Sequence, residues 1–461
     1  FFLNFVEMKV KALSRSQSST ERECIGDPRK LFRNLDPSHH PLQRAREYQR
    51  AVVGAKLDRM FAKPLIGNLG NGHMDGVTAS ATSRKALIPF ISGSADGQVK
   101  LWDLSTRTQV AQMNGHAKMV LGLCFSLDGQ HFYSGSDDGF VRCWSIASAI
   151  DPVTRESSHG PLATWRTNGS FKCLDHHWSE DRFATATDDS VCIWSSERSN
   201  PIQKYSDLWG SDDTVNVVRY NPAEGNLIGV CTMDRGIGLF DTRVGSELKK
   251  TILRMRSNCL EWNPMEPMNF VVGNEDFNAY SFDMRKLDQP TRIHKGHTSA
   301  IMSISWSPTG REFVTGSYDR TIRIFPFDTG VSRDIYHTKR MQRVFCVNYT
   351  LDNKFIISGS DDTNLRIWKA HSSEKLGQTT TREESATQYR QALVKKYQHM
   401  PEIARISKSR KVPKVIKNQT ALTQIQLQSA NRKQENRIKH SKPGTFKFES
   451  EKKKIVVKEV L

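Results

Sequence analysis

Short apolar runs separated by glycine and aspartate turns recur through the middle of the chain. The clearest set is Met119–Phe125, Phe132–Ser136 and Phe140–Trp144, with turns at residues 128–129 and 137–139. Short apolar or alternating runs bounded by such turns are typical of antiparallel strands joined by hairpins. The pattern therefore predicts β-structure through this part of the chain.

The aromatic residue that closes this set has six counterparts, spaced 42 to 50 residues apart, and an aspartate stands six positions before each. A Gly-His entry and an aromatic exit about forty residues apart are typical of one blade of a WD40 β-propeller. The sequence therefore predicts an all-β fold, a seven-bladed WD40 β-propeller over residues 65–369, with basic, partly α-helical N- and C-terminal extensions. The aromatics are Trp102, Trp144, Trp194, Phe240, Phe282, Phe325 and Trp368, and the aspartates are Asp96, Asp138, Asp188, Asp234, Asp276, Asp319 and Asp362.

The repeated aspartate has a local structural explanation. In a hairpin turn its carboxylate accepts hydrogen bonds from turn amides and from a histidine of the preceding loop. Where the set is complete, a buried chain runs from histidine through a hydroxyl or carboxylate to the indole N–H. We interpret these residues as scaffold and not as catalysts. The residues interpreted in this way are His116, Asp138, Trp144, His297, Asp319, Asp362 and Trp368.

The repeats are not equally regular. The first blade is expected over residues 72–103, and an insertion at 151–159 lengthens the entry into the third. Blades four and five lack the Gly-His entry and are expected to be the least regular. Long inter-strand loops of a propeller often carry its binding specificity.

Charge divides the chain into the same parts as the repeat does. The net charge is +18, with +7 over residues 8–63, +13 over 370–461 and −1 over 64–369. A neutral propeller with two basic flanks indicates a protein-docking body whose arms bind a polyanion, usually nucleic acid. The alternative is that lysine-rich ends only keep the chain in solution.

The flanks are expected to be partly helical. Residues 1–7 are interpreted as a leader upstream of Met8, and residues 8–64 as a basic arm with one helix over 42–63 that packs on the propeller. In the extension 370–461, a capping box from Thr381 to Glu384 predicts a helix that ends at Pro401. A second helix is expected over 420–440, and the remainder is expected to be partly disordered.

Cations are concentrated in this extension. Lysines and arginines interleaved with apolar residues, or spaced along a helix, track phosphates with little sequence preference. We therefore hypothesise that the extension binds RNA. The candidate residues are Arg405, Lys408, Arg410, Lys411, Lys414, Lys417, Arg437, Lys439, Lys442, Lys452, Lys453 and Lys454.

Several patterns resemble catalytic or metal sites but lack their requirements. The glycines of residues 67–72 precede a strand, whereas a dinucleotide loop follows one. His39-His40 has no third ligand at suitable spacing, and neighbours within Asp175–Trp178 point to opposite faces of a strand. No catalytic residue, metal or cofactor is predicted. The eight cysteines form no C-x-x-C pair and indicate a reducing compartment, and no apolar run approaches the about eighteen residues of a membrane span.

Two arginines occupy equivalent places in consecutive blades. Arg243 and Arg285 each lie three residues after the closing aromatic, within Phe-Asp-x-Arg. Similar blades present equivalent residues at the same rim, so we expect both to face outward there. Each is interpreted either as a surface salt bridge or as a protein contact.

Motifs outside the generic repeat resemble the Sof family of WD40 proteins, which carry a dedicated basic C-terminal extension. They cover nearly the whole chain from Met8. The matching segments are Asp36-Pro37 with His40-Pro41, Arg46-Glu47-Tyr48, Phe61–Pro64, Asp175–Trp178, Trp262–Glu266, Asn274-Glu275-Asp276, Phe282–Arg285, Tyr336–Gln342 and Arg437–Gly444.

This resemblance implies a non-enzymatic assembly factor of the small-subunit processome in the nucleus and nucleolus. Such proteins associate with the box C/D small nucleolar ribonucleoprotein that contains fibrillarin, and they are needed to process the precursor of small-subunit ribosomal RNA. Animal members are also described as substrate receptors of cullin-RING ubiquitin ligases. The segments ending at Arg243 and Arg285 are similar to the Trp-Asp-x-Arg motif with which such receptors contact the ligase adaptor, with Phe in place of Trp.

Overall fold

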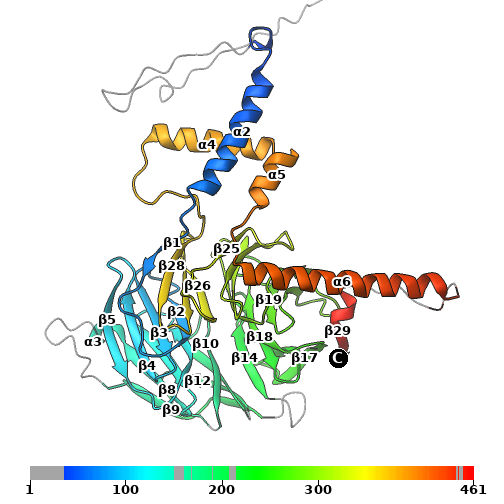
Figure 1. Ribbon diagram of the computed structural model, residues 1–461. Coiled ribbons are helices and arrows are strands. Elements are labelled where there is room, and N and C mark those ends of the chain that lie inside the picture. Colours follow the sequence, from blue (N-terminus) through cyan, green and yellow to red (C-terminus); the bar gives the residue numbers. More distant parts are fainter. Residues whose placement is uncertain are drawn as a thin grey trace, which may run out of the picture. The chain divides into compact units, whose positions relative to one another are not determined.

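A computed structural model describes residues 36–149, 160–167, 169–188, 190–206, 214–442, 445 and 450–460. It divides into two compact units (Figure 1). The smaller unit is built from Ser373–Ser409 and the described part of Phe1–Ala62, and the larger from Lys63–Ser372 with Arg410–Leu461. Residues 1–7, the arm to residue 35 and the 151–159 insertion lie outside the described residues, so the expectations for them stay predictions.

The larger unit contains seven antiparallel sheets, which confirms the seven-bladed propeller. Blade one is β2 (Val77–Thr82), β3 (Pro89–Ser94), β4 (Gln98–Asp103) and β5 (Thr108–Asn114). Blade two is β6 (Val120–Phe125), β7 (His131–Ser136), β8 (Phe140–Ser145) and β9 (Ala163–Arg166). Blade three is β10 (Phe171–His176), β11 (Arg182–Thr187), β12 (Val191–Ser195) and β13 (Gln203–Tyr205).

The remaining blades follow in chain order. Blade four is β14 (Val215–Tyr220), β15 (Leu227–Thr232), β16 (Gly236–Asp241) and β17 (Ser246–Leu253), with β29 (Val456–Val460) added at its edge. Blade five is β18 (Ser257–Trp262), β19 (Asn269–Asn274), β20 (Ala279–Asp283) and β21 (Arg292–His294). Blade six is β22 (Ile301–Trp306), β23 (Glu312–Ser317), β24 (Ile322–Pro326) and β25 (Asp334–Tyr336). Blade seven is β26 (Val344–Tyr349), β27 (Phe355–Ser360), β28 (Leu365–Lys369) and β1 (Leu65–Asn68).

The first strand of each blade packs on the first strand of the next, and β26 packs on β2, so the ring is closed. In blades one to six the outer strand follows the closing aromatic of its repeat, and in blade seven the outer strand is β1. The first sheet therefore runs from Val77 to Asn114, and not over residues 72–103 as expected. The interior is apolar, with Trp102, Phe132, Phe183 and Phe270 all buried.

Ring closure depends on β1, which pairs antiparallel with β28 at the opposite end of the repeat region. Leu65 lies opposite Trp368 and Asn68 opposite Arg366. The Lys369 amide donates to the Pro64 carbonyl at 2.8 Å, and the Leu69 amide donates to the Leu365 carbonyl at 2.9 Å. Both flanks of the propeller therefore leave from blade seven.

The smaller unit contains α2 (Gln43–Met60), α4 (Thr381–Lys396) and α5 (Pro401–Lys408), preceded by the turn η1 (Pro37–His39). The helix predicted over 42–63 is present as Gln43–Met60, and its buried residues pack within the smaller unit. The expected packing of this helix on the propeller stays a prediction. Ala51, Val52 and Ala55 form one apolar cluster with Leu393 of α4 and Ile403 of α5.

Polar contacts complete this helical unit. The Lys396 ammonium binds the Glu47 carboxylate at 2.7 Å and, with bonds from Gln43 and Tyr397, lowers the pKa of Glu47 to about 2. The Tyr48 hydroxyl donates to Glu402 at 2.9 Å. The unit thus joins residues from both flanks of the propeller.

Two boundaries of the C-terminal helices differ from the expectation. The Thr380 hydroxyl, not that of Thr381, accepts the Glu383 amide at 3.3 Å and caps α4. α4 ends at Lys396, and Pro401 begins α5, because proline is well tolerated in the first helical turn. The next helix, α6 (Lys414–His440), starts six residues before the predicted 420–440.

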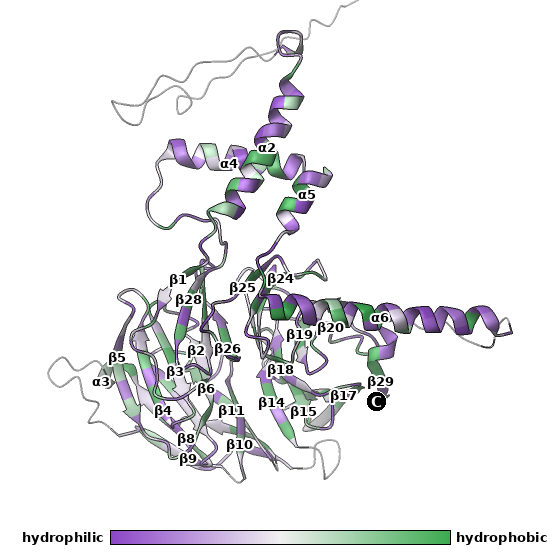
Figure 2. Cartoon of the chain, in the orientation of Figure 1, coloured by the Kyte–Doolittle hydropathy of each residue, from purple (hydrophilic) through white to green (hydrophobic). Residues whose placement is uncertain are grey.

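The last described segment returns to the propeller. After η2 (Lys453–Ile455), β29 pairs antiparallel with β17, with Lys250 opposite Val460 and Ile252 opposite Lys458. Blade four, expected to be irregular, is thus the one described sheet with five strands. The described elements also include α3 (Ile146–Ala149). Figure 2 shows α6 as largely hydrophilic beside the mixed pattern of the blades.

The closing strand gives a direct stability test. Leu69 is 0% exposed in the cluster with Phe90 and Trp102, whereas Leu65 of β1 is 39% exposed. Leu69→Ala should lower the free energy of unfolding by about 2–5 kcal/mol because it leaves a cavity in a closed seam. Thermal unfolding of the full chain measures this loss. Leu65→Ala, at an exposed side chain of the same seam, is the matched control, and an equal loss in both variants would contradict the role of the buried Leu69 side chain.

Candidate nucleic-acid and adaptor interfaces

The repeat residues of blade two form the expected buried chain. His116 Nε2 lies 2.7 Å from Ser134 Oγ, which accepts the Trp144 indole N–H at 2.9 Å. The other ring nitrogen of His116 lies 3.1 Å from the Asp138 carboxylate. Burial lowers the pKa of His116, which favours the neutral ring. Both ring nitrogens of His116 are therefore engaged within the blade.

Blades six and seven use variants of this chain. His297 lies 2.7 Å from Thr315 Oγ1 and 2.8 Å from Asp319. Because Phe325 provides no indole donor, nothing equivalent to the Trp144 N–H reaches the Thr315 hydroxyl, which lies 3.3 Å from the Arg323 carbonyl. In blade seven Asp362 pairs with Arg366, and the Trp368 indole donates to Ser358 at 2.8 Å. The scaffold interpretation therefore fits the geometry of the predicted repeat residues.

The histidine pair of blade three also has structural partners. His176 Nε2 lies 3.2 Å from Asp181, and its Nδ1 lies 2.8 Å from the His177 carbonyl. His177 Nδ1 accepts the Glu180 amide at 2.9 Å. Among the residues that the structure describes, no three histidines, cysteines or acidic residues are grouped to hold a metal ion. In the same residues, no helix is long and apolar enough to span a membrane.

The basic extension is attached to blade six where it leaves the smaller unit. The Arg410 guanidinium lies 3.5 Å from Asp334 and donates to the Arg333 carbonyl. Its side chain is 16% exposed, so Arg410, predicted as an RNA contact, is an attachment point instead. Six residues later Ile416 is the buried residue of α6.

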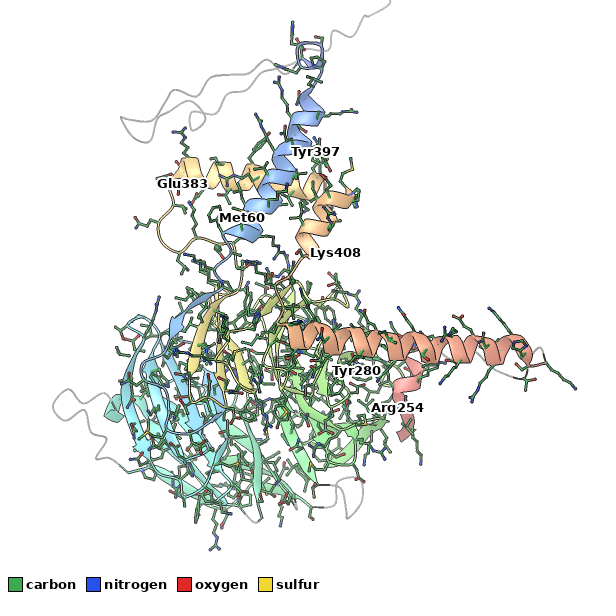
Figure 3. The ribbon with its side chains drawn as sticks, in the orientation of Figure 1. Met60, Arg254, Tyr280, Glu383, Tyr397 and Lys408 are labelled. Atoms are coloured by element: carbon green, nitrogen blue, oxygen red, sulfur yellow. The ribbon has the colours of Figure 1, made fainter. Side chains whose placement is uncertain are left out.

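The far part of the extension is attached to blades four and five. The backbone amide of Arg254 donates to the Ile455 carbonyl at 3.0 Å, and Arg254 is labelled in Figure 3. Lys295 binds Glu451 at 2.6 Å, and Lys452 donates to the Thr291 carbonyl. Lys454 donates to Gln434 of α6 at 3.1 Å. α6 is thus held at two places. Arg410, just before its first turn, binds blade six, and Gln434 in its later half binds the tail that pairs with blade four.

The predicted RNA candidates do not form a single cluster. Arg405 and Lys408 belong to α5 in the smaller unit, and the others belong to the larger unit. Lys408 is labelled in Figure 3. Two exposed cations of α6, Arg432 and Lys433, were missed because they lie inside a glutamine- and asparagine-rich stretch. The candidates with exposed side chains are Arg405, Lys408, Lys411, Lys414, Lys417, Arg437, Lys439, Lys442, Lys452, Lys453 and Lys454.

Arg243 and Arg285 follow β16 and β20, which are equivalent strands of adjacent blades. Arg285 binds Asp283 through two nitrogens at 3.2 and 3.1 Å, and these bonds lower the pKa of Asp283. Arg243 lies 3.5 Å from Asp241. The two side chains are 75% and 63% exposed respectively, so each is positioned by its aspartate yet accessible.

This geometry defines a WD40-repeat β-propeller protein with a basic helical extension bound to its own blades. In agreement, the WD domain, G-beta repeat, matches residues 65–103, 107–145, 288–325 and 334–369. The Sof1-like domain matches residues 370–456. The propeller and the extension are therefore both recognisable as members of known families of domains.

Full-length relatives share both parts. "DDB1- and CUL4-associated factor 13" of Homo sapiens is 45% identical over 450 residues, covering 98% of this chain and 99% of its own. The Danio rerio protein of that name is 43% identical over 454 residues, covering 98% and 100%. "Protein SOF1" of Saccharomyces cerevisiae is 40% identical over 470 residues, covering 98% and 94%. The chain belongs to the Sof1 family of WD40-repeat proteins, as the resemblance implied.

The buried network of blade six predicts a pH-dependent stability. Burial by itself raises the pKa of Asp319, but the interaction with His297 and the hydrogen bonds to the carboxylate outweigh this effect. The pKa of Asp319 is therefore lowered from 3.8 to about 2. At neutral pH, Asp319→Asn should therefore lower the free energy of unfolding by about 2–4 kcal/mol. A carboxyl group whose pKa is lower in the folded state than in the unfolded state stabilises the fold at pH values above the unfolded-state pKa. This stabilisation is lost as the pH falls through the folded-state pKa.

The difference between the natural chain and Asp319→Asn should consequently shrink between about pH 4 and pH 2. Urea unfolding at several pH values measures it. Asp328→Asn, at a carboxylate that is 90% exposed, is the control and should change little. A constant difference down to pH 2 would contradict the assignment to Asp319.

Proposed function

We propose that this protein is a non-enzymatic assembly scaffold of the small-subunit processome in the nucleolus. In this proposal it joins the box C/D small nucleolar ribonucleoprotein that contains fibrillarin and supports processing of the precursor of small-subunit ribosomal RNA. Membership of the family that includes "Protein SOF1" supports the proposal. The structural observation that carries it is the attachment of α6 at two places, near its start and in its later half.

A helix held in two places presents its charges in a fixed arrangement. Arg410 joins the start of α6 to blade six, and Lys454 joins Gln434 to the tail bound on blade four. Between and beyond these points most of α6 is exposed, with Ile416 as its buried residue. Fixed cations lose less conformational entropy on binding than free ones, so this arrangement favours contact with a phosphate backbone.

The charge distribution indicates that RNA binding and protein docking use different parts of the chain. The propeller segment 64–369 carries −1, whereas 370–461 carries +13. A neutral body with loops on its blades suits protein partners, and the basic extension suits RNA. The nuclear and nucleolar location follows from that assignment and is part of the proposal.

The exposed cations of α6 provide the test. Arg432→Gln, Lys433→Gln and Arg437→Gln together should weaken RNA association without removing an attachment point. Cells in which this variant replaces the natural protein should accumulate unprocessed small-subunit precursor, measured by hybridisation to precursor RNA. With purified full-length protein, the logarithmic salt dependence of oligouridine affinity should become shallower by about 2.

The matched control removes the same charge elsewhere. Arg166, Arg198 and Lys204 are exposed on blades two and three, and their replacement by glutamine should leave processing normal. Normal precursor levels with the α6 variant, at equal protein abundance, would contradict the proposed role of the extension.

A second function is favoured by one observation, the pair Arg243 and Arg285. We propose that these arginines contact the adaptor of a cullin-RING ubiquitin ligase, for which the chain acts as a substrate receptor. The printed names of the animal relatives refer to association with DDB1 and CUL4. In this chain both arginines are exposed, lie at equivalent places on neighbouring blades and are oriented by aspartates.

Arg243→Ala with Arg285→Ala should abolish co-purification of the adaptor DDB1 and leave RNA association intact. Arginines oriented in this way are frequent anchors of protein interfaces, and loss of such an anchor typically costs at least about 2 kcal/mol of binding. The exposed pair Arg166→Ala and Arg198→Ala is the control. Unchanged recovery of the adaptor would exclude this contact.

A further inference from the structure

The propeller is neutral as a whole, but one part of its loop surface is not. Arg320 lies in the turn between β23 and β24, and Lys339, Arg340 and Arg343 lie in the loop that leads from β25 to β26. All four side chains are exposed. These residues, called here the blade six–seven patch, belong partly to Tyr336–Gln342, which the generic repeat does not explain.

The end of the second loop that carries Arg343 lies against the hairpin that carries Arg320. The Arg343 guanidinium stacks on the Tyr318 ring at 5.3 Å, and Tyr318 lies two residues before Arg320. Tyr318 also packs edge-on against Phe345 at 5.8 Å. Stacking on an aromatic ring fixes a guanidinium while leaving its N–H donors available.

Among the residues that the structure describes, the cations of the patch have no acidic partners. No described carboxylate lies within ion-pair distance of Arg320, Lys339, Arg340 or Arg343, whereas Arg142, Arg256 and Arg333 are all paired on the same propeller. Of the neighbouring acids, Asp319 is buried against His297, and Asp361 is exposed. Four exposed cations beside one exposed carboxylate give this part of the surface a positive charge that attracts anions.

The backbone at Arg320 has the left-handed conformation that recurs in this turn of the repeat. Its φ is 64°, in the left-handed region that glycine occupies in the equivalent turns at Gly97 and Gly139. A non-glycine residue there is unfavourable, yet Arg235 and Phe277 have φ of 67° and 73° in the equivalent turns of blades four and five. This backbone conformation therefore belongs to the turn of the repeat and does not by itself indicate a function. Thr363, in the equivalent turn of blade seven, has a φ of 68° and no charge.

The exposed side chains distinguish between kinds of anionic partner. Protein interfaces usually combine anchoring arginines with tryptophan or tyrosine side chains that become buried. In the patch Met341 is buried, and Tyr318 and Phe345 are partly buried, so the exposed groups are cationic or polar. A surface of this kind suits the phosphate backbone of a nucleic acid, which is bound by charge with little sequence preference.

We propose that Arg320, Lys339, Arg340 and Arg343 form a second nucleic-acid contact, located on the propeller and binding the phosphates of single-stranded RNA. The protein then holds RNA at two places, α6 and the blade six–seven patch. This inference does not depend on the processome role, because it concerns RNA binding by the purified protein.

The test uses the full chain and fluorescein-labelled oligouridine, with affinity measured by anisotropy over a series of salt concentrations. Arg320→Gly, Lys339→Gln and Arg340→Gln together should weaken binding by about tenfold at low salt and make the logarithmic salt slope shallower by about 2. Glycine relieves the backbone at position 320, so the melting temperature should not fall. Arg320→Asn, which also tolerates this conformation, replaces it if the glycine variant unfolds.

Two controls separate charge from backbone effects. Thr363→Gly relieves the equivalent strain without removing a cation, and Arg166→Gln, Arg198→Gln and Lys204→Gln remove three cations elsewhere. Both should leave the slope and affinity unchanged. An unchanged slope in the patch variant would overturn the proposal, and so would equal displacement of RNA by a polyglutamate of the same charge, since that would indicate an acidic protein partner. Normal RNA processing with a shallower slope would contradict the processome role and leave this inference standing.

Discussion

The pairing of β1 with β28 is the constraint on which the rest of the structure depends. It closes the ring with a strand from before the first blade, and the Lys369 amide binds the Pro64 carbonyl beside it. The two flanks of the propeller therefore begin next to each other, although 305 positions separate residues 64 and 369. This proximity explains why α2 from one flank and α4 and α5 from the other share one apolar cluster.

The extension shows how a basic tail becomes part of a folded surface. Arg410 and Lys452 are each used for attachment, to Asp334 and to the Thr291 carbonyl. The edge of blade four accepts β29, so an otherwise unpaired strand edge is covered by the chain's own end. Some cations thus hold the extension in place, and those left exposed on α6 are available to a polyanion.

The propeller was predictable from sequence because its signal is repeated seven times and is local to each hairpin. The helix α2 was also predictable, because the spacing of its apolar residues is a local signal. The packing partner of α2, the role of Arg410 and the strand β29 were not, because each depends on contacts between residues far apart in the chain. Likewise, the neutral total of residues 64–369 concealed the cations around Arg320, since a sum of charges does not report their positions.

The central claim is that cations fixed on the folded surface, rather than the propeller as a neutral body, hold the ribonucleoprotein. Ultraviolet crosslinking of the full-length protein to RNA in cells, with crosslinked peptides mapped by mass spectrometry, tests it most directly. We expect crosslinks to small-subunit precursor RNA within α6, the tail before β29 and the loop before β26. Crosslinks confined to the remaining blades, or absent while the protein still sediments with precursor particles, would contradict it.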